Sequence, residues 1–142
     1  MFGKTYDQRL LAWSNFRKSL ETSEDPIQDT IDFYKASPNV SINTDPWDKT
    51  RWPSPWELVE ENQYCEFCTV LGICYSLQLT DRFSQTQFEI HISVDTKTSS
   101  THYLLFVGDT VIGYPDNESI IHVNDLPDSI STKKIYCMNE TQ

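Results

Sequence analysis

The sequence predicts an α+β protein, in which N-terminal helices and a central buried helix pack on a small antiparallel sheet. Two observations support this fold class. Apolar residues recur at helical spacing as far as Leu79, and after Asp81 the apolar period changes to two. Helices followed by strands, without alternation between them, are typical of a sheet that is antiparallel. The length of 142 residues fits one domain, which we expect to span residues 1–142.

Two helices are expected near the N-terminus. The segment Thr5–Gln8 has the capping-box pattern, and the residues that follow place apolar side chains at helical spacing: Tyr6, Leu10, Trp13 and Leu20. This predicts a helix at roughly residues 6–20. Asp25 and Pro26 give a second start signal, which predicts a helix at about residues 26–36. The short polar link between the two helices predicts that they are antiparallel neighbours.

A third helix is expected at about residues 55–79. Ser54, Pro55 and Glu57 supply an N-cap, a proline at the first helical position and a capping-box acid. Asn62 could, however, end one helix and begin another. Only such a break would place Cys65 in the first turn of a helix. The small residues of the second half form a stripe that suits a helix lying close against a sheet: Cys65, Thr69, Gly72 and Ser76.

The C-terminal part of the chain is expected to form the sheet. Residues 87–94 alternate apolar and polar side chains, which predicts one buried face and one open face with His91 on the open side. His122 is likewise expected at a solvent face. Gly108 and Asp109 are a two-residue hairpin signal. The remaining strands are expected at about residues 102–107, 110–114, 120–123 and 134–138.

The composition excludes several classes of function. The chain has 11 Lys and Arg against 21 Asp and Glu, a net charge of -10, which argues against nucleic-acid binding because phosphate neutralisation supplies most of that affinity. Its many aromatic residues exclude a disordered acidic tail. The first residues lack the apolar core of a signal peptide, and the charge-free stretch Phe67–Thr80 is too short to span a bilayer. We therefore expect no membrane role and no export.

A surface for protein binding is predicted around three tryptophans. Residues 37–55 form a long loop that carries Trp47 and Trp52, and Trp56 follows it. Acidic side chains surround them, among them Glu60 and Glu61. Aromatic residues are enriched at the centres of protein interfaces. The alternative is that the indoles hold the long loop onto the core.

The candidate catalytic residues are Cys65, His102 and Asp116. A thiol at a helix N-terminus has a lowered pKa, and with a nearby imidazole it gives a thiolate that attacks acyl groups. A third polar group must then hold the imidazole. A regular two-residue hairpin would pair His102 with Pro115, which leaves Asp116 on the opposite face unless a bulge intervenes. The alternative is a buried core thiol with an incidental histidine.

Cys65 and Cys68 also have the spacing of a redox or metal-binding pair. A metal site needs four ligands, and Cys74 and Cys137 are isolated, so no metal is expected. A redox pair of the thioredoxin type follows a strand, whereas a helix is predicted before Cys65. The chain has only 4 glycines and no phosphate-binding glycine loop, so no cofactor is expected.

Five segments taken together resemble a set of small acidic proteins encoded by contractile-tailed phages of marine cyanobacteria. They are Tyr6–Leu10, Trp52–Leu58, Tyr64–Phe67, Leu79–Phe83 and Phe88–Ile92. The resemblance implies a viral origin and a location in the host cytoplasm or the virion. It also implies a non-enzymatic virion or assembly component that binds a viral or host protein.

A second resemblance concerns Trp52 to Asp116. Transglutaminase-like cysteine enzymes have, in this order, a tryptophan-bearing lead-in, a cysteine in the first turn of a central helix, a histidine on a following strand and an aspartate on the next. The resemblance implies that Cys65 is the nucleophile, His102 the base and Asp116 the orienting acid of an acyltransferase or peptidase. Protein binding is our first hypothesis, and this cysteine chemistry is the alternative.

Overall fold

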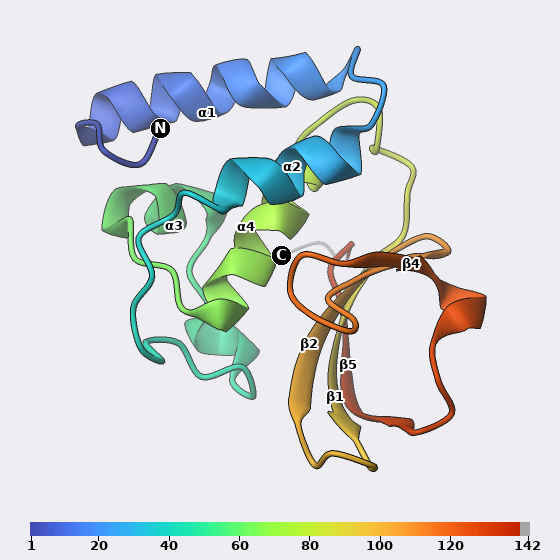
Figure 1. Cartoon of the computed structure of the whole chain (residues 1–142). Helices are drawn as coiled ribbons and strands as arrows, with labels where there is room; N and C mark the ends of the chain where they lie inside the picture. Colours follow the sequence, from blue (N-terminus) through green and yellow to red (C-terminus); the bar gives the residue numbers. More distant parts are fainter. Residues whose placement is uncertain (140–142) are drawn as a thin grey trace. The chain divides into compact units, whose positions relative to one another are not determined.

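The computed structural model describes residues 1–139 and shows an α+β protein. The chain divides into two compact units, residues 1–84 and residues 85–142 (Figure 1). The four α-helices belong to the first unit and the five-stranded sheet to the second. The predicted fold class is thereby confirmed, while the assignment of residues 1–142 to a single domain stays a prediction.

Helices α1 (Tyr6–Leu20) and α2 (Pro26–Tyr34) begin at the predicted caps. A capping box closes the start of α1, and the Asp25 side chain accepts from the third residue after it at the start of α2. The two helices run in opposite directions (Figure 1). Phe16 of α1 stacks on Phe33 of α2, with 3.9 Å between ring centroids. Helix α2 ends two residues earlier than expected, at Tyr34.

The predicted continuous helix over residues 55–79 is wrong, because the chain forms α3 (Pro55–Glu61) and α4 (Glu66–Gln78). Asn62 ends α3 in the left-handed conformation with φ 53°, which asparagine adopts more readily than most residues. Its backbone N–H donates to the Leu58 carbonyl, and its side-chain amide donates to the Phe2 carbonyl at 2.9 Å. The break therefore depends on one residue that is held from both its backbone and its side chain.

The long loop between α2 and α3 is fixed to the rest of the first unit. Trp52 donates its indole N–H to the Asp45 carbonyl at 3.1 Å and packs on Phe67, with ring centroids 4.9 Å apart. Near its start, Val40 N–H donates to the Tyr64 carbonyl. Tyr64 forms an isolated parallel bridge with Asn39. Extended backbone, not helix, therefore precedes Cys65.

The small residues of α4 make room for α1 and α2. A Cβ atom added at Gly72 would lie 2.7 Å from Cε1 of Tyr34 in α2. Ser76 lies one turn further on, where its hydroxyl accepts from the Trp13 indole at 2.9 Å and lies 3.0 Å from the Tyr34 hydroxyl. Within the first unit, helix packing thus accounts for these two members of the small-residue stripe.

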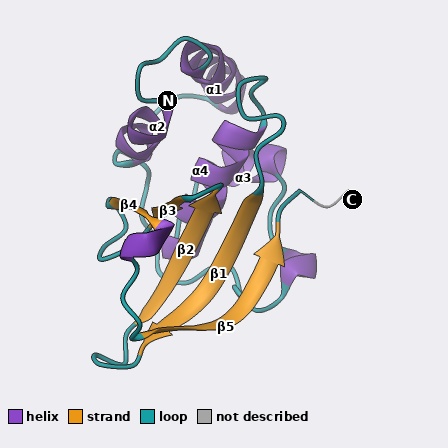
Figure 2. Ribbon diagram, turned by 90° about the vertical axis from the view of Figure 1, so that its right-hand side faces the viewer, coloured by secondary structure: helices purple, strands orange, loops and turns teal. Residues whose placement is uncertain are grey.

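The second unit is an antiparallel sheet in the order β4-β3-β2-β1-β5 (Figure 2). Val107 pairs with Thr110 around Gly108 and Asp109, so the predicted two-residue hairpin is confirmed. The final strand begins four residues earlier than predicted, and the strand after the hairpin ends two residues earlier. The strands are β1 (Phe88–Asp95), β2 (Thr101–Val107), β3 (Thr110–Ile112), β4 (Ile120–His122) and β5 (Ile130–Cys137).

The predicted open face of β1 is wrong at His91 and Ser93, both of which are buried. The His91 ring stacks on Phe106 of β2, with centroids 3.8 Å apart, and its Nε2 lies 2.9 Å from a carboxylate oxygen of Glu89. Phe106 pairs with Glu89, so its ring lies on the same face as His91. An aromatic residue on the neighbouring strand thus covers the expected solvent face at His91. His122 is exposed, as predicted.

Candidate functional site

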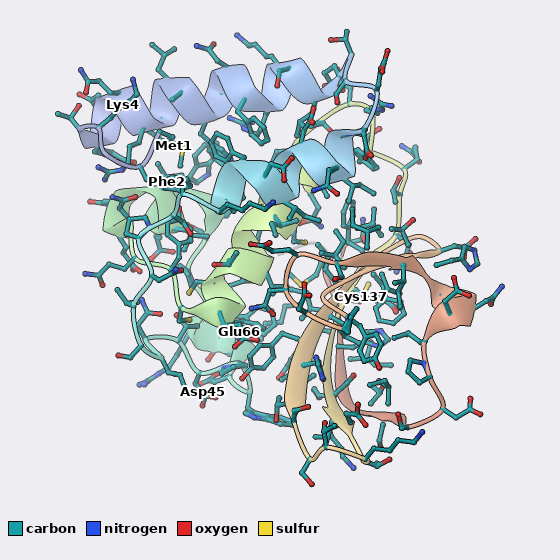
Figure 3. All side chains as sticks on the ribbon, in the orientation of Figure 1. Met1, Phe2, Lys4, Asp45, Glu66 and Cys137 are labelled. Carbon is teal, nitrogen blue, oxygen red and sulfur yellow. The ribbon has the colours of Figure 1, made fainter. Side chains whose placement is uncertain are left out.

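Cys65 is the N-cap residue of α4, with extended backbone at φ -71° and ψ 171°. Its sulfur accepts a hydrogen bond from the Cys68 backbone N–H at 3.4 Å. The side chain is only 3% exposed. Glu66 marks the first turn of this helix in Figure 3, and Asp45 lies on the loop before α3. The left-handed Asn62 and the bridge at Tyr64 together place the Cys65 thiol at the helix start.

The second cysteine of the pair, Cys68, lies one turn into α4 and is completely buried. Its sulfur lies 3.2 Å from the Thr44 hydroxyl and 3.6 Å from the side-chain oxygen of Asn43. The loop between α2 and α3 therefore supplies two polar contacts to this thiol.

The two thiols differ in acidity. The Cys68 thiol lowers the pKa of Cys65 below the ordinary thiol value, and the backbone N–H groups of Cys68, Asn43 and Phe67 lower it further, against the opposing effect of burial. The hydrogen bond to Cys65 and burial raise the pKa of Cys68. When the pair loses one proton, Cys65 therefore carries the negative charge and Cys68 keeps its hydrogen.

Cys74, on the same helix, shows the behaviour of an ordinary core thiol. It is completely buried, and desolvation raises its pKa. Its sulfur lies 3.4 Å from the side-chain oxygen of Gln78. Within α4, the pKa is therefore lowered for the thiol at the helix start and raised for the thiol in the helix interior.

The other two predicted catalytic residues, His102 and Asp116, lie in the second unit. His102 is on β2, where its Nε2 lies 3.3 Å from the Ser100 hydroxyl. The Asp116 carboxylate accepts from the Glu118 backbone N–H at 2.9 Å and from the Ser119 hydroxyl at 3.0 Å. No hydrogen bond joins His102 to Asp116 within residues 1–139. The catalytic role of Cys65, His102 and Asp116 stays a prediction.

The predicted aromatic and acidic surface contains two kinds of tryptophan. Trp47 is 56% exposed, and Trp56 is half exposed with its ring edge against Trp13. Trp52 instead packs on the core, as the alternative interpretation expected. Glu60 and Glu61 are exposed at the end of α3. Trp47 and Trp56 are thus available at the surface, whereas Trp52 mainly holds the loop.

Sequence reasoning missed three residues that define these features. Ile42 is 82% exposed, although it is an aliphatic residue. Asn43 and Thr44 contact the Cys68 thiol from 25 and 24 positions away. The spacing of Cys65 and Cys68, after a possible helix break at Asn62, identified the cysteine pair as a candidate site. The sequence around Asn43 and Thr44 contains no pattern that predicts their contact with the Cys68 thiol.

Among residues 1–139, no group of three or more His, Cys, Asp or Glu side chains could hold a metal ion. No helix in that range is long and apolar enough to cross a membrane. No protein-family model matches the sequence, and no curated protein matches it.

Proposed function

We propose that this chain is a non-enzymatic virion or assembly component of a phage and acts by binding a viral or host protein. The single observation that carries the proposal is the exposure of Ile42 and Trp47 on a loop whose backbone is fixed. Large apolar side chains that are exposed on an ordered loop are typical of interface anchors.

The loop is held in place by contacts within the first unit. Backbone hydrogen bonds join it to Tyr64, and the Trp52 ring packs on Phe67. The Asp45 carboxylate accepts from the Trp47 backbone N–H at 2.9 Å. A partner would therefore meet side chains whose backbone is already fixed, which lowers the entropy cost of binding.

Charge around the loop indicates the chemistry of the partner. Residues 40–66 contain only two basic residues, Lys49 and Arg51, against six acidic ones. A partner with an apolar cavity and basic residues around it would complement this surface. The acidic residues are Asp45, Asp48, Glu57, Glu60, Glu61 and Glu66.

Replacing the two most exposed apolar side chains of the loop, Ile42→Ser with Trp47→Ser, should abolish partner binding. Each is a candidate hot spot, and loss of one hot-spot residue typically weakens binding by about 2 kcal/mol, about thirtyfold in Kd. Tagged wild-type and double-variant chains would be recovered from infected cells and from purified virions, with the bound proteins quantified by mass spectrometry.

The matched control is Leu11→Ser, because Leu11 is a 64% exposed aliphatic residue of α1 outside the loop. It should leave the recovered partners unchanged. Both variants should keep the wild-type melting temperature, since neither loses a buried contact. Retention of the same partners by the double variant, or absence of the wild-type chain from virions and from complexes, would contradict the proposal.

We propose the cysteine acyltransferase or peptidase as the second candidate, and one observation favours it. Of the two structural conditions that the sequence set, a helix break at Asn62 is met, so Cys65 begins α4. The neighbouring Cys68 thiol lowers the Cys65 pKa most, and backbone N–H groups of Cys68, Asn43 and Phe67 lower it further, against the opposing effect of burial. A nucleophilic thiol requires such a lowered pKa, because its thiolate is the attacking form.

Alkylation of Cys65 by iodoacetamide should reach half its maximal rate below the pH of ordinary thiols, about 8.5. A lowered pKa means that the thiolate is present at a pH where other cysteines are protonated, and it is lost only as the pH falls through that lowered value. Mass spectrometry of the labelled peptides would follow each cysteine. Cys74, with its raised pKa, should stay unlabelled in the folded protein.

Two variants separate the sources of this acidity. Cys68→Ala removes the thiol that contributes most to the lowered pKa, so the midpoint should move up towards the ordinary value. His102→Ala should also raise the midpoint if an imidazolium of His102 stabilises the thiolate, as the acyltransferase requires. An unchanged profile in His102→Ala would argue against that enzyme and leave the protein-binding proposal standing.

A further inference from the structure

The pair Cys65 and Cys68 meets the structural requirements of a dithiol–disulfide site. The spacing of the pair alone did not favour this chemistry, because a helix was predicted before Cys65. The structure instead places the Tyr64–Asn39 bridge directly before Cys65, and α4 begins immediately after it. Thiol exchange at the start of a helix uses this arrangement. It consists of extended backbone, a cysteine at the N-cap and a second cysteine one turn later.

We propose that Cys65 and Cys68 form a reversible disulfide by exchange with a disulfide of low molecular mass. Both are free thiols in this structure, and the Cys65 sulfur accepts from the Cys68 backbone N–H at 3.4 Å, so it lies over the turn that carries Cys68. Residues three apart on a helix have Cβ atoms about 5–6 Å apart, and a disulfide needs about 3.5–4.5 Å. Cys65 is the cap: its φ and ψ lie outside the helical region, while its carbonyl accepts the first helical hydrogen bond from the Thr69 N–H. The proposed bond therefore requires a small shift at the cap residue that closes this gap.

The order of events follows from the difference between the thiols. The Cys65 thiolate bonds to one sulfur of the oxidant, whose own S–S bond breaks and releases one thiol. Cys68 then loses its proton to solvent, its sulfur bonds to the Cys65 sulfur, and the mixed disulfide breaks to release the second thiol. The chain loses two hydrogens and two electrons, and the oxidant gains them as two thiols.

Burial determines the size of the oxidant. The attacking residue, Cys65, is 3% exposed, and the loop residues Asn43 and Thr44 contact Cys68. A protein disulfide could not approach this sulfur without unfolding the loop, whereas a small disulfide needs only a local opening. Oxidation also removes the Cys68 thiol hydrogen, so Cys68 can no longer donate to the Asn43 side-chain oxygen that lies 3.6 Å from its sulfur.

The experiment incubates the full chain with glutathione disulfide and glutathione over a series of ratios, followed by acid quenching and intact mass analysis. The wild type should lose two hydrogen masses as the ratio rises, with the Cys65–Cys68 bond found by peptide mapping and reversed by dithiothreitol. Cys68→Ala should instead gain one glutathionyl group on Cys65. Cys65→Ala should gain none on Cys68, because the attacking thiolate is gone.

Cys74→Ala serves as the matched control, because it removes another buried thiol of the same helix and should oxidise like the wild type. A urea-unfolded sample establishes that all the thiols can react. If folded wild-type protein keeps both thiols in glutathione disulfide alone while the unfolded sample reacts, the proposal is overturned. The proposal is also overturned if wild-type Cys65 becomes glutathionylated and the Cys68 sulfur does not displace the glutathione.

Discussion

Replacing Trp13 by alanine should lower the free energy of unfolding of the first unit by about 3–5 kcal/mol. The indole is 1% exposed, and its N–H donates to Ser76 at 2.9 Å. The Arg17 guanidinium lies 4.2 Å from its ring centroid. Alanine would leave a cavity where α1 meets α4 and would remove one of the two contacts to the Ser76 hydroxyl. Chemical denaturation followed by circular dichroism would measure the loss.

Two further variants separate packing from hydrogen bonding at this position. Trp13→Phe keeps most of the apolar volume but deletes the N–H, so it should cost about 1 kcal/mol for the hydrogen bond plus the smaller packing loss. Leu11→Ala, on the exposed side of the same helix, should change stability by less than about 0.5 kcal/mol. A Trp13→Ala protein as stable as Leu11→Ala would show that α1 does not depend on this contact.

The fold class and the first two helices could be predicted because their signals are local. The capping boxes at Thr5 and Ser54 both form as the sequence indicates. The break at Asn62 could be stated only as an alternative, since it depends on a tertiary hydrogen bond from the Asn62 amide to the Phe2 carbonyl. The buried state of His91 was missed for the same reason, because Phe106 reaches it from another strand.

The candidate site was predictable in position but not in chemistry. Spacing singled out Cys65 and Cys68, and the helix-start alternative correctly described the surroundings of Cys65. Which groups set the acidity of the thiols was not readable from spacing, because Asn43 and Thr44 reach the pair through the folding of a long loop. Sequence periodicity reports which face of an element is apolar, whereas a polar site depends on contacts between distant segments.

In the second unit, Gly113→Ala should lower the free energy of unfolding by at least about 2 kcal/mol. Gly113 has φ 116°, a conformation in which a side chain is strained by about 1–3 kcal/mol. Its Cβ atom would also lie 2.8 Å from the Tyr103 carbonyl oxygen, which belongs to the backbone of β2 and cannot move alone. Glycine is therefore required where the chain leaves the hairpin, after the Leu105–Ile112 pair.

Gly108→Ala is the matched control, because it tests positive φ without the steric conflict. Gly108 has φ 57°, and an added Cβ atom would meet nothing within 4 Å. The left-handed conformation alone costs alanine about 1–2 kcal/mol, so Gly108→Ala should be the milder variant. Denaturation of both variants in parallel would measure the difference. If they lose equal stability, the contact between Gly113 and the Tyr103 carbonyl does not limit the side chain at position 113. If Gly113→Ala loses more, the difference measures the added cost of the Tyr103 carbonyl contact together with that of the larger positive φ at position 113.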